Sequence, residues 1–82
     1  MHEFAITQEL VKVARETAQK EQIQNVTKIV VDLGLLTTYE EESLQYYFKA
    51  LQPKEDALKD ATLVVEENEG NEIKITSIAG EK

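Results

Sequence analysis

The chain has 82 residues, no cysteine and one histidine, and it carries a formal net charge of −7 with an isoelectric point near 4.6. This length fits one domain, and the composition excludes both a disulfide and a four-ligand structural zinc site. The acidic balance argues against nucleic acid as a partner, because phosphate binding depends on clustered Lys and Arg. No apolar stretch approaches the roughly 20 residues that cross a bilayer, so we expect a cytoplasmic protein without a membrane partner.

The first two segments predict a helix followed by a strand. Residues 4–20 carry apolar or small residues at helical spacing, namely Ile6, Leu10, Val13, Ala14, Thr17 and Ala18. Residues 26–35 alternate, which predicts a half-buried strand with Ile29, Val31, Leu33 and Leu35 on its apolar face. Gly34, near the end of this strand, predicts a bulge or a close backbone approach and no chemical role.

A second helix is expected over residues 40–51. Thr37 and Thr38 precede Glu40 and Glu41 at the three-residue separation of a capping box. Apolar residues then follow at helical spacing: Leu44, Tyr47, Phe48 and Leu51. Pro53 lies just past the predicted end of the helix, and residues 53–60 are expected to form a solvated connection.

Two short β-rich runs, residues 62–67 and 72–78, complete the chain. The polar residues 68–71 lie between them and predict a hairpin in which Gly70 adopts a positive φ. The expected fold class is therefore α+β, with residues 1–82 forming a single αβαββ domain. We expect a three-stranded mixed sheet with both helices packed on one face.

The strongest chemical feature is the opening tripeptide Met1-His2-Glu3. The Met1 amine and the His2 amide nitrogen would close a five-membered ring on a cation, and that amide with His2 Nδ1 would close a six-membered ring. Ni(II) and Cu(II) favour such planar, nitrogen-rich coordination, whereas Zn(II) favours a tetrahedron. The alternative is that His2 has no role at a chain terminus and that Glu3 only caps the first helix.

The chain resembles the HypA-type nickel-incorporation factors that help to mature nickel-iron hydrogenases. The residues that carry the resemblance are Met1-His2-Glu3-Phe4 with Ile6-Thr7, Leu33-Gly34, Glu42-Ser43-Leu44-Gln45 with Phe48, Gly70-Asn71-Glu72 with Ile75, and Ser77-Ile78. The resemblance implies that the tripeptide binds nickel, with His2 as the indispensable ligand and Glu3 in support. It also implies two partners, the nickel-carrying GTPase of the hydrogenase maturation pathway and the hydrogenase large subunit.

The sequence departs from that family in one large respect. HypA-type factors normally insert a zinc module with two Cys-x-x-Cys pairs between the last two strands, whereas residues 68–71 occupy its place here. The resemblance therefore implies a nickel-binding domain in which a short turn replaces the zinc module. Whatever that module contributes to partner recognition is in doubt for this chain.

No other residue pattern indicates catalysis, so we expect a protein that is not an enzyme. The chain lacks a nucleophile paired with a base and lacks a glycine-rich phosphate loop. Glu40, Glu41 and Glu42 point about 100° apart on a helix and are interpreted as acids at a helix start. Tyr47 is expected in the core and Tyr46 as an exposed partner contact.

The function predicted from sequence is a nickel metallochaperone domain that binds Ni(II) at its N-terminus and delivers it to nickel-iron hydrogenase. One alternative is a metal-free acidic protein–protein interaction module on the same scaffold. A second is copper binding, because the same donors hold Cu(II) more tightly than Ni(II).

Overall fold

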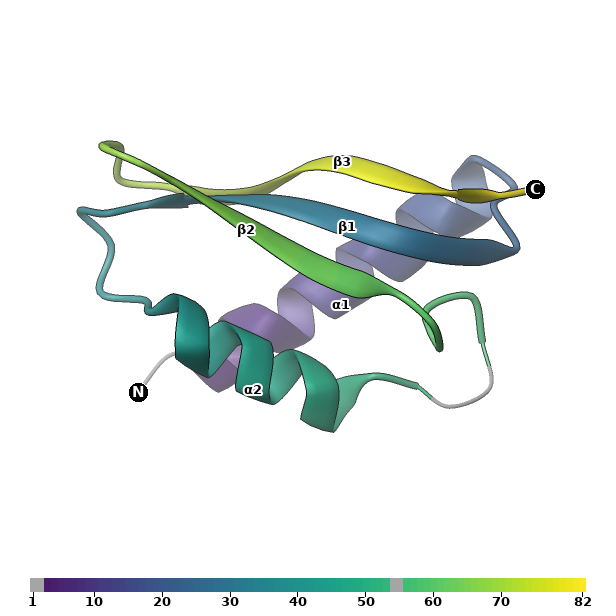
Figure 1. The fold of residues 1–82 in the computed structure, drawn as a ribbon, viewed down its shortest axis with the longest axis horizontal. Coiled ribbons are helices and arrows are strands. Elements are labelled where there is room, and N and C mark those ends of the chain that lie inside the picture. The colour runs from purple at the N-terminus through teal and green to yellow at the C-terminus, as the bar shows by residue number, and fades with distance from the viewer. Residues whose placement is uncertain (1–2, 54–55) are drawn as a thin grey trace.

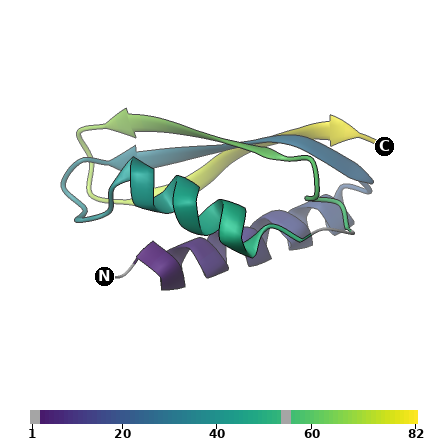
Figure 2. The same ribbon diagram turned by 60° about the horizontal axis from the view of Figure 1, so that its bottom comes forward.

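The computed structural model of the protein describes residues 3–53 and 56–82. Its elements follow in the order α1 (Glu3–Lys20), β1 (Asn25–Gly34), α2 (Glu41–Leu51), β2 (Thr62–Asn68) and β3 (Ile73–Glu81). The three strands form one mixed sheet, and both helices lie against the same face of it (Figures 1 and 2). The predicted α+β class, the αβαββ order and the two-layer packing are confirmed.

The predicted hairpin is wrong, because β2 and β3 do not pair with each other. The strand order is β2-β1-β3, with β1 parallel to β2 and antiparallel to β3. Strand β1 has the most completely buried inner face, which packs against the two helices. Its central position in the sheet also pairs both of its edges with neighbouring strands. The four residues between β2 and β3 are long enough to cross the end of β1, which adjacency in sequence did not reveal.

This crossing takes place over Gly34. The Gly34 amide donates to the Glu72 carbonyl at 2.8 Å, and a Cβ at Gly34 would lie 2.4 Å from the Gly70 carbonyl oxygen. The prediction of a close backbone approach at Gly34 is therefore confirmed. The positive φ predicted for Gly70 is wrong, since no described glycine has one. The connection crosses one intervening strand, β1, so it is wider than the tight hairpin turn in which glycine commonly has a positive φ.

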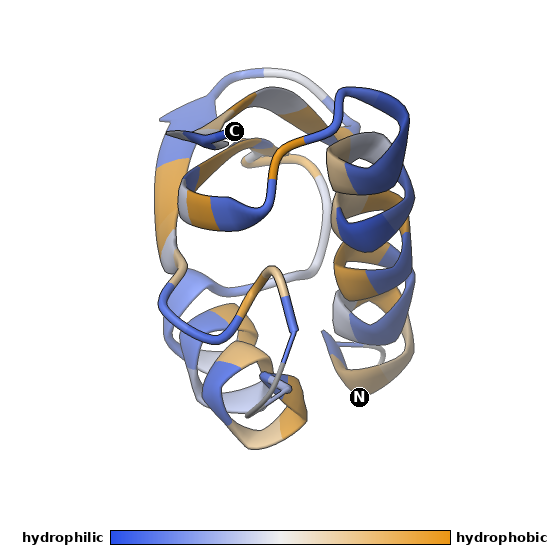
Figure 3. Ribbon diagram, turned by 90° about the vertical axis from the view of Figure 1, so that its right-hand side faces the viewer, coloured by the Kyte–Doolittle hydropathy of each residue, from blue (hydrophilic) through white to orange (hydrophobic). Residues whose placement is uncertain are grey.

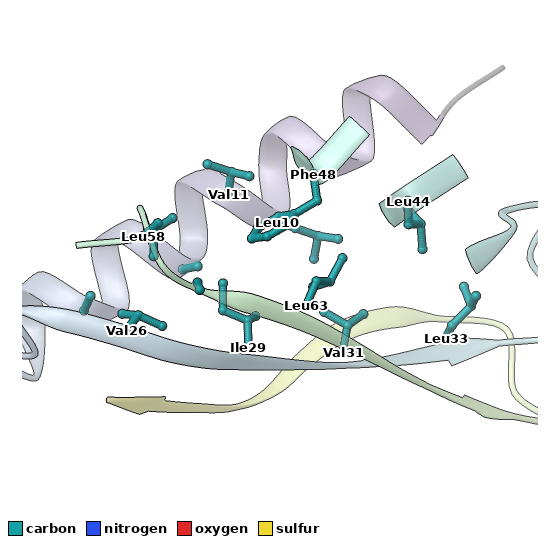
Figure 4. Packing of buried hydrophobic residues seen from close by; sticks show 13 residues of the cluster. Leu10, Val11, Val26, Ile29, Val31, Leu33, Leu44, Phe48, Leu58 and Leu63 are labelled. Carbon is teal, nitrogen blue, oxygen red and sulfur yellow. The ribbon is translucent and has the colours of Figure 1, made fainter. Parts of the chain in front are cut away.

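The core lies between the sheet and the two helices. In Figure 4 the side chains of Val26, Ile29, Val31 and Leu33 extend from β1 toward the helices. They meet Leu10 and Val11 of α1, Leu44 and Phe48 of α2, and Leu63 of β2. Each helix alternates hydrophobic and hydrophilic residues along its length, as expected of amphipathic helices (Figure 3).

Two details of the predicted core faces are corrected. The stripe of α1 that is most deeply buried runs through Thr7, Val11, Ala14 and Ala18, and it leaves Val13 37% exposed. Leu35, which alternation placed on the core face, lies beyond the last residue of β1 and is 57% exposed. The strand ends at Gly34 because the crossing connection closes over it there.

The predicted capping box of α2 is also wrong. The N-cap is Glu40, and its side chain makes no capping hydrogen bond. The Thr37 hydroxyl instead donates to the Gly34 carbonyl at 2.7 Å and accepts from the Tyr39 amide at 3.4 Å. Thr37 therefore stabilises the turn after β1 and leaves the helix start uncapped by a side chain.

The described part of the connection after α2, residues 52–53 and 56–61, is more buried than the predicted solvated segment, of which residues 54–55 lie outside the described residues. Leu58 is fully buried in the core, and the Leu58 amide donates to the Asp56 carboxylate at 2.8 Å. The Gln52 side-chain amide donates to the carbonyls of Leu58 and Ala61 at 2.7 and 2.9 Å. Asp56 also accepts from Arg15 of α1 at 2.9 Å. These hydrogen bonds hold Leu58 in the core although the residues around it in the chain are mostly polar.

We expect Gly34→Ala to lower the free energy of unfolding by about 1–3 kcal/mol, because the added methyl group meets backbone atoms that cannot move separately. Chemical denaturation measures this effect. The matched control is Gly70→Ala, where the only close atom is the Asn68 side-chain oxygen at 2.8 Å, which also accepts from the Gly70 amide. Because a side chain can move aside, the expected loss is smaller, about 1 kcal/mol or less. Equal stability of the two variants would contradict the crossing geometry.

Candidate metal site at the start of the chain

Of the three predicted metal ligands, the structure describes Glu3, whereas Met1 and His2 lie outside the described residues. Glu3 is the first residue of α1 and is half-buried. Its position in the first turn suits a carboxylate, because the amides there carry partial positive charge and have no intrahelical acceptor. A supporting metal ligand and a helix-capping acid are both compatible with this placement.

The first turn of α1 is anchored by one buried hydrogen bond and one ring contact. The hydroxyl of Thr7, a fully buried residue, donates to the Glu3 carbonyl one turn earlier. The Phe4 ring packs edge-on against Tyr47 of α2, with centroids 5.4 Å apart and planes at 80°. Glu3 therefore begins a helix whose first turn is attached to the core and to α2.

The ring contact continues to a third aromatic residue. Tyr46 and Tyr47 meet edge-on with centroids 5.2 Å apart. Tyr46 is 69% exposed, as the sequence predicted, and Phe4 is 45% exposed. Tyr47 is half-buried and lies outside the buried core, so the prediction of core packing for it is wrong. Its ring contacts Tyr46 and also Phe4, the residue that follows Glu3 in the chain.

The chain's negative charge gathers at the end of the molecule where α1 begins. The N-terminal end of α1, the start of α2 and the β2–β3 connection all lie at this end (Figures 1 and 2). We define the acidic end as residues 3–4, 32–42 and 66–74. It holds nine of the sixteen Asp and Glu residues and one of the nine Lys and Arg residues, which leaves seven acids and eight bases elsewhere. The whole negative excess therefore lies in the acidic end, which includes Glu3, the described residue of the candidate site.

These acids do not form a metal cage of their own. Within residues 3–53 and 56–82, no group of three His, Cys, Asp or Glu residues is arranged to hold a metal ion. An open polar hollow on the outer face of the sheet is lined by Asp32 and Glu72, but Lys74 also lines it. Glu40, Glu41 and Glu42 are exposed around the start of α2, in agreement with the interpretation that they are helix-start acids.

Sequence reasoning missed an apolar feature at the same end. Leu35 and Leu36 are 57% and 74% exposed, and both lie in a turn closed by the Thr37 amide and the Gly34 carbonyl at 3.1 Å. We call residues 34–37 the leucine turn. Alternation extended the strand through Leu35, and so it hid the turn. The available signal was Gly34, which marks the end of the strand.

Both the fold and the sequence are similar to those of known proteins. The solution structure of the Ni metallochaperone HypA from Helicobacter pylori superimposes with a TM-score of 0.85, over 99% of this chain and 98% of that one. At 18% identity, this likeness concerns the fold. A hydrogenase maturation factor HypA from Caldanaerobacter subterraneus subsp. tengcongensis is 45% identical over 51 residues, which are 62% of this chain and 45% of the relative.

A second relative, the hydrogenase maturation factor HypA of Methanocella arvoryzae, is 34% identical over 65 residues. The match covers 79% of this chain and 57% of that protein, so the chain spans about half the length of the curated relatives it matches. The family model described as hydrogenase/urease nickel incorporation, metallochaperone, hypA matches residues 1–78.

The model that matches nearly the whole chain is that of a family of nickel-incorporation metallochaperones. The chain belongs to the HypA family. The resemblance drawn from the sequence is thereby confirmed, as is the expectation that the chain is not an enzyme, because a metallochaperone carries metal rather than converting a substrate. Among the described residues, no helix is long and apolar enough to span a membrane.

We expect Phe4→Ala to lower the free energy of unfolding by about 1 kcal/mol, because it removes the edge-on ring contact that ties α1 to α2. Hydrogen exchange should quicken at the Thr7 and Gln8 amides, whose helical acceptors are the Glu3 and Phe4 carbonyls. The control is Phe4→Tyr, which keeps the ring. If exchange in Phe4→Ala matched the wild type, the contact would not anchor the first turn.

Proposed function

We propose that this domain binds one Ni(II) ion at its N-terminus and delivers it for the maturation of nickel-iron hydrogenase. The ligands in this proposal are the Met1 amine, the His2 amide and imidazole, and Glu3 in support. The observation that carries the proposal is the family match, which begins at Met1 and includes all three residues. HypA-type metallochaperones incorporate nickel, and this tripeptide is the part of the chain best suited by its chemistry to hold it.

The donor set suits nickel because its chelate rings are small and contiguous. Two rings that share the His2 amide nitrogen hold three donors in one plane, and an oxygen or water completes a planar set. Glu3 could supply that oxygen. The ligands of such a site can leave one at a time, so the ion can pass to a receiving protein without a change of fold.

The described structure supports this role in two ways. The anchored first turn of α1 fixes the residue from which the predicted site extends. The acidic end attracts divalent cations and so raises their local concentration. These features favour cation capture at the acidic end over the rest of the chain, where bases slightly outnumber acids.

The proposal includes the partners and the compartment implied by the family. The nickel-carrying GTPase of the hydrogenase maturation pathway and the hydrogenase large subunit would exchange nickel with the domain in the cytoplasm. We further propose that residues 1–82 are the nickel-binding domain alone, with residues 68–71 in the place of the zinc module. The greater length of the relatives and the short β2–β3 connection support this division.

Substitution of the predicted ligands tests the site. In calorimetric titrations of a chain that starts at Met1, His2→Ala should weaken apparent nickel affinity at least about a hundredfold, because it removes one ligand and one chelate ring. Glu3→Gln should cost roughly tenfold or less. Its control is Glu9→Gln, which makes the same change of charge at an exposed position of α1 and should leave affinity unchanged.

Two outcomes of these titrations would contradict the proposed site. One is equal nickel binding by the wild type and His2→Ala, and the other is equal binding by a chain with residues added ahead of Met1. The rival function, a metal-free interaction module, predicts no measurable nickel binding and partner binding that survives His2→Ala.

Nickel affinity should also depend steeply on pH. The amine and the imidazole must lose their protons to bind, and the amide must lose one as well, so apparent affinity should rise at least about a hundredfold between pH 6 and pH 8. Titrations in matched buffers across this range give the slope. A flat profile would exclude the combination of amine and imidazole as ligands.

A further inference from the structure

The leucine turn displays two large apolar side chains whose exposure the fold does not require. Leu35 and Leu36 occupy the two central positions of a turn, where small polar residues are the common choice. Neither belongs to the core or packs against it as a partly buried neighbour. Side chains that are 57% and 74% exposed contribute little to folding, and two adjacent exposed leucines form an apolar patch that a partner can cover.

Four backbone and side-chain hydrogen bonds hold this turn rigid. The Leu35 amide donates to the Asn68 carbonyl at 2.8 Å, and the Leu36 amide donates to the Gly70 carbonyl at 2.9 Å. The Thr37 amide and hydroxyl donate to the Gly34 carbonyl at 3.1 and 2.7 Å. The backbone is therefore satisfied internally while the leucine side chains project outward. A surface ordered in advance loses less conformational entropy when a partner binds.

The surroundings of the turn specify the charge of the partner. Glu40, Glu41 and Glu42 follow it in the chain, and Glu69 and Glu72 lie in the connection to which it is bonded. All five are exposed. A second copy of the chain would bring the same acids against these, and like charges across an interface oppose association. A basic surface is complementary.

We propose that the leucine turn is the docking point for a protein partner that presents an apolar cleft bordered by lysine and arginine. This inference rests on the proposed function, because the partner is the protein that exchanges nickel with the domain. The turn and the start of α1 lie at the same end of the molecule (Figures 1 and 2). Docking there would bring the partner to the acidic end, where its own ligands could replace those of the proposed nickel site one at a time.

Binding to purified partners tests the proposal. The probes are the nickel-carrying GTPase and the hydrogenase large-subunit precursor from the same organism, each titrated with the untagged chain. The double variant Leu35→Ser, Leu36→Ser should weaken binding to at least one of them by about tenfold or more. The control is Val13→Ser, which changes an exposed apolar residue on α1 and should leave binding unchanged.

A second pair of variants tests whether the acids near the leucine turn contribute to partner binding. Glu41→Gln with Glu42→Gln should slow association severalfold and reduce its dependence on salt, whereas Glu16→Gln with Glu21→Gln, remote from the turn, should not. All four acids are exposed, so both variants should fold. Glu41 and Glu42 lie in the first turn of α2, so their double variant should melt a few degrees lower, and binding is measured well below that temperature.

The outcomes separate this inference from the proposed function. Loss of docking in the leucine variant with unchanged nickel affinity supports the inference, and so does docking by His2→Ala, which should lose nickel. Equal partner affinity of the leucine variant and the wild type would overturn it, as would equal weakening by Val13→Ser. Failure of the wild type to bind either partner, or self-association that the leucine variant abolishes, would also overturn it. A chain that docks through the leucines but binds no nickel would instead refute the proposed function alone.

Discussion

The passage of the β2–β3 connection across the end of β1 is the constraint on which this structure depends. It places β1 between two neighbours, so the strand with the most apolar inner face lies in the middle of the sheet and under both helices. It requires glycine at position 34, because any side chain there would collide with the backbone of Gly70. It also supplies the carbonyls of Asn68 and Gly70 that hold the leucine turn in place.

The same crossing brings the functional features to one end. The start of α1, the turn after β1 and the β2–β3 connection are distant in sequence, yet all lie at the acidic end. Glu3, the exposed leucines and eight further acids thereby lie at one end of a small domain. A metallochaperone must both hold an ion and meet a receiver, and we propose that both tasks take place at this end.

Local sequence patterns predicted the elements well and their pairing poorly. Helical and alternating periodicities located α1, β1 and α2 to within one or two residues, because burial on one face imposes those periods. Strand order depends on which strand buries most apolar surface in the central position. A short polar segment with a glycine looks the same in sequence whether the strands on either side pair with each other or are separated by a third strand. A register shift between Val26 and Lys28 likewise lets Val26 share the inner face with Ile29, which strict alternation cannot show.

The sequence predicted the ligand chemistry of the candidate site but not the surface around it. The ligand types and chelate rings of Met1-His2-Glu3 are properties of the sequence, whereas the leucine turn and the gathering of acids arise from the crossing. X-ray absorption of the nickel-loaded chain tests the central claim most directly. We expect a planar, four-coordinate Ni(II) with an imidazole ligand that disappears in His2→Ala. A six-coordinate spectrum without imidazole, identical in the two proteins, would contradict it.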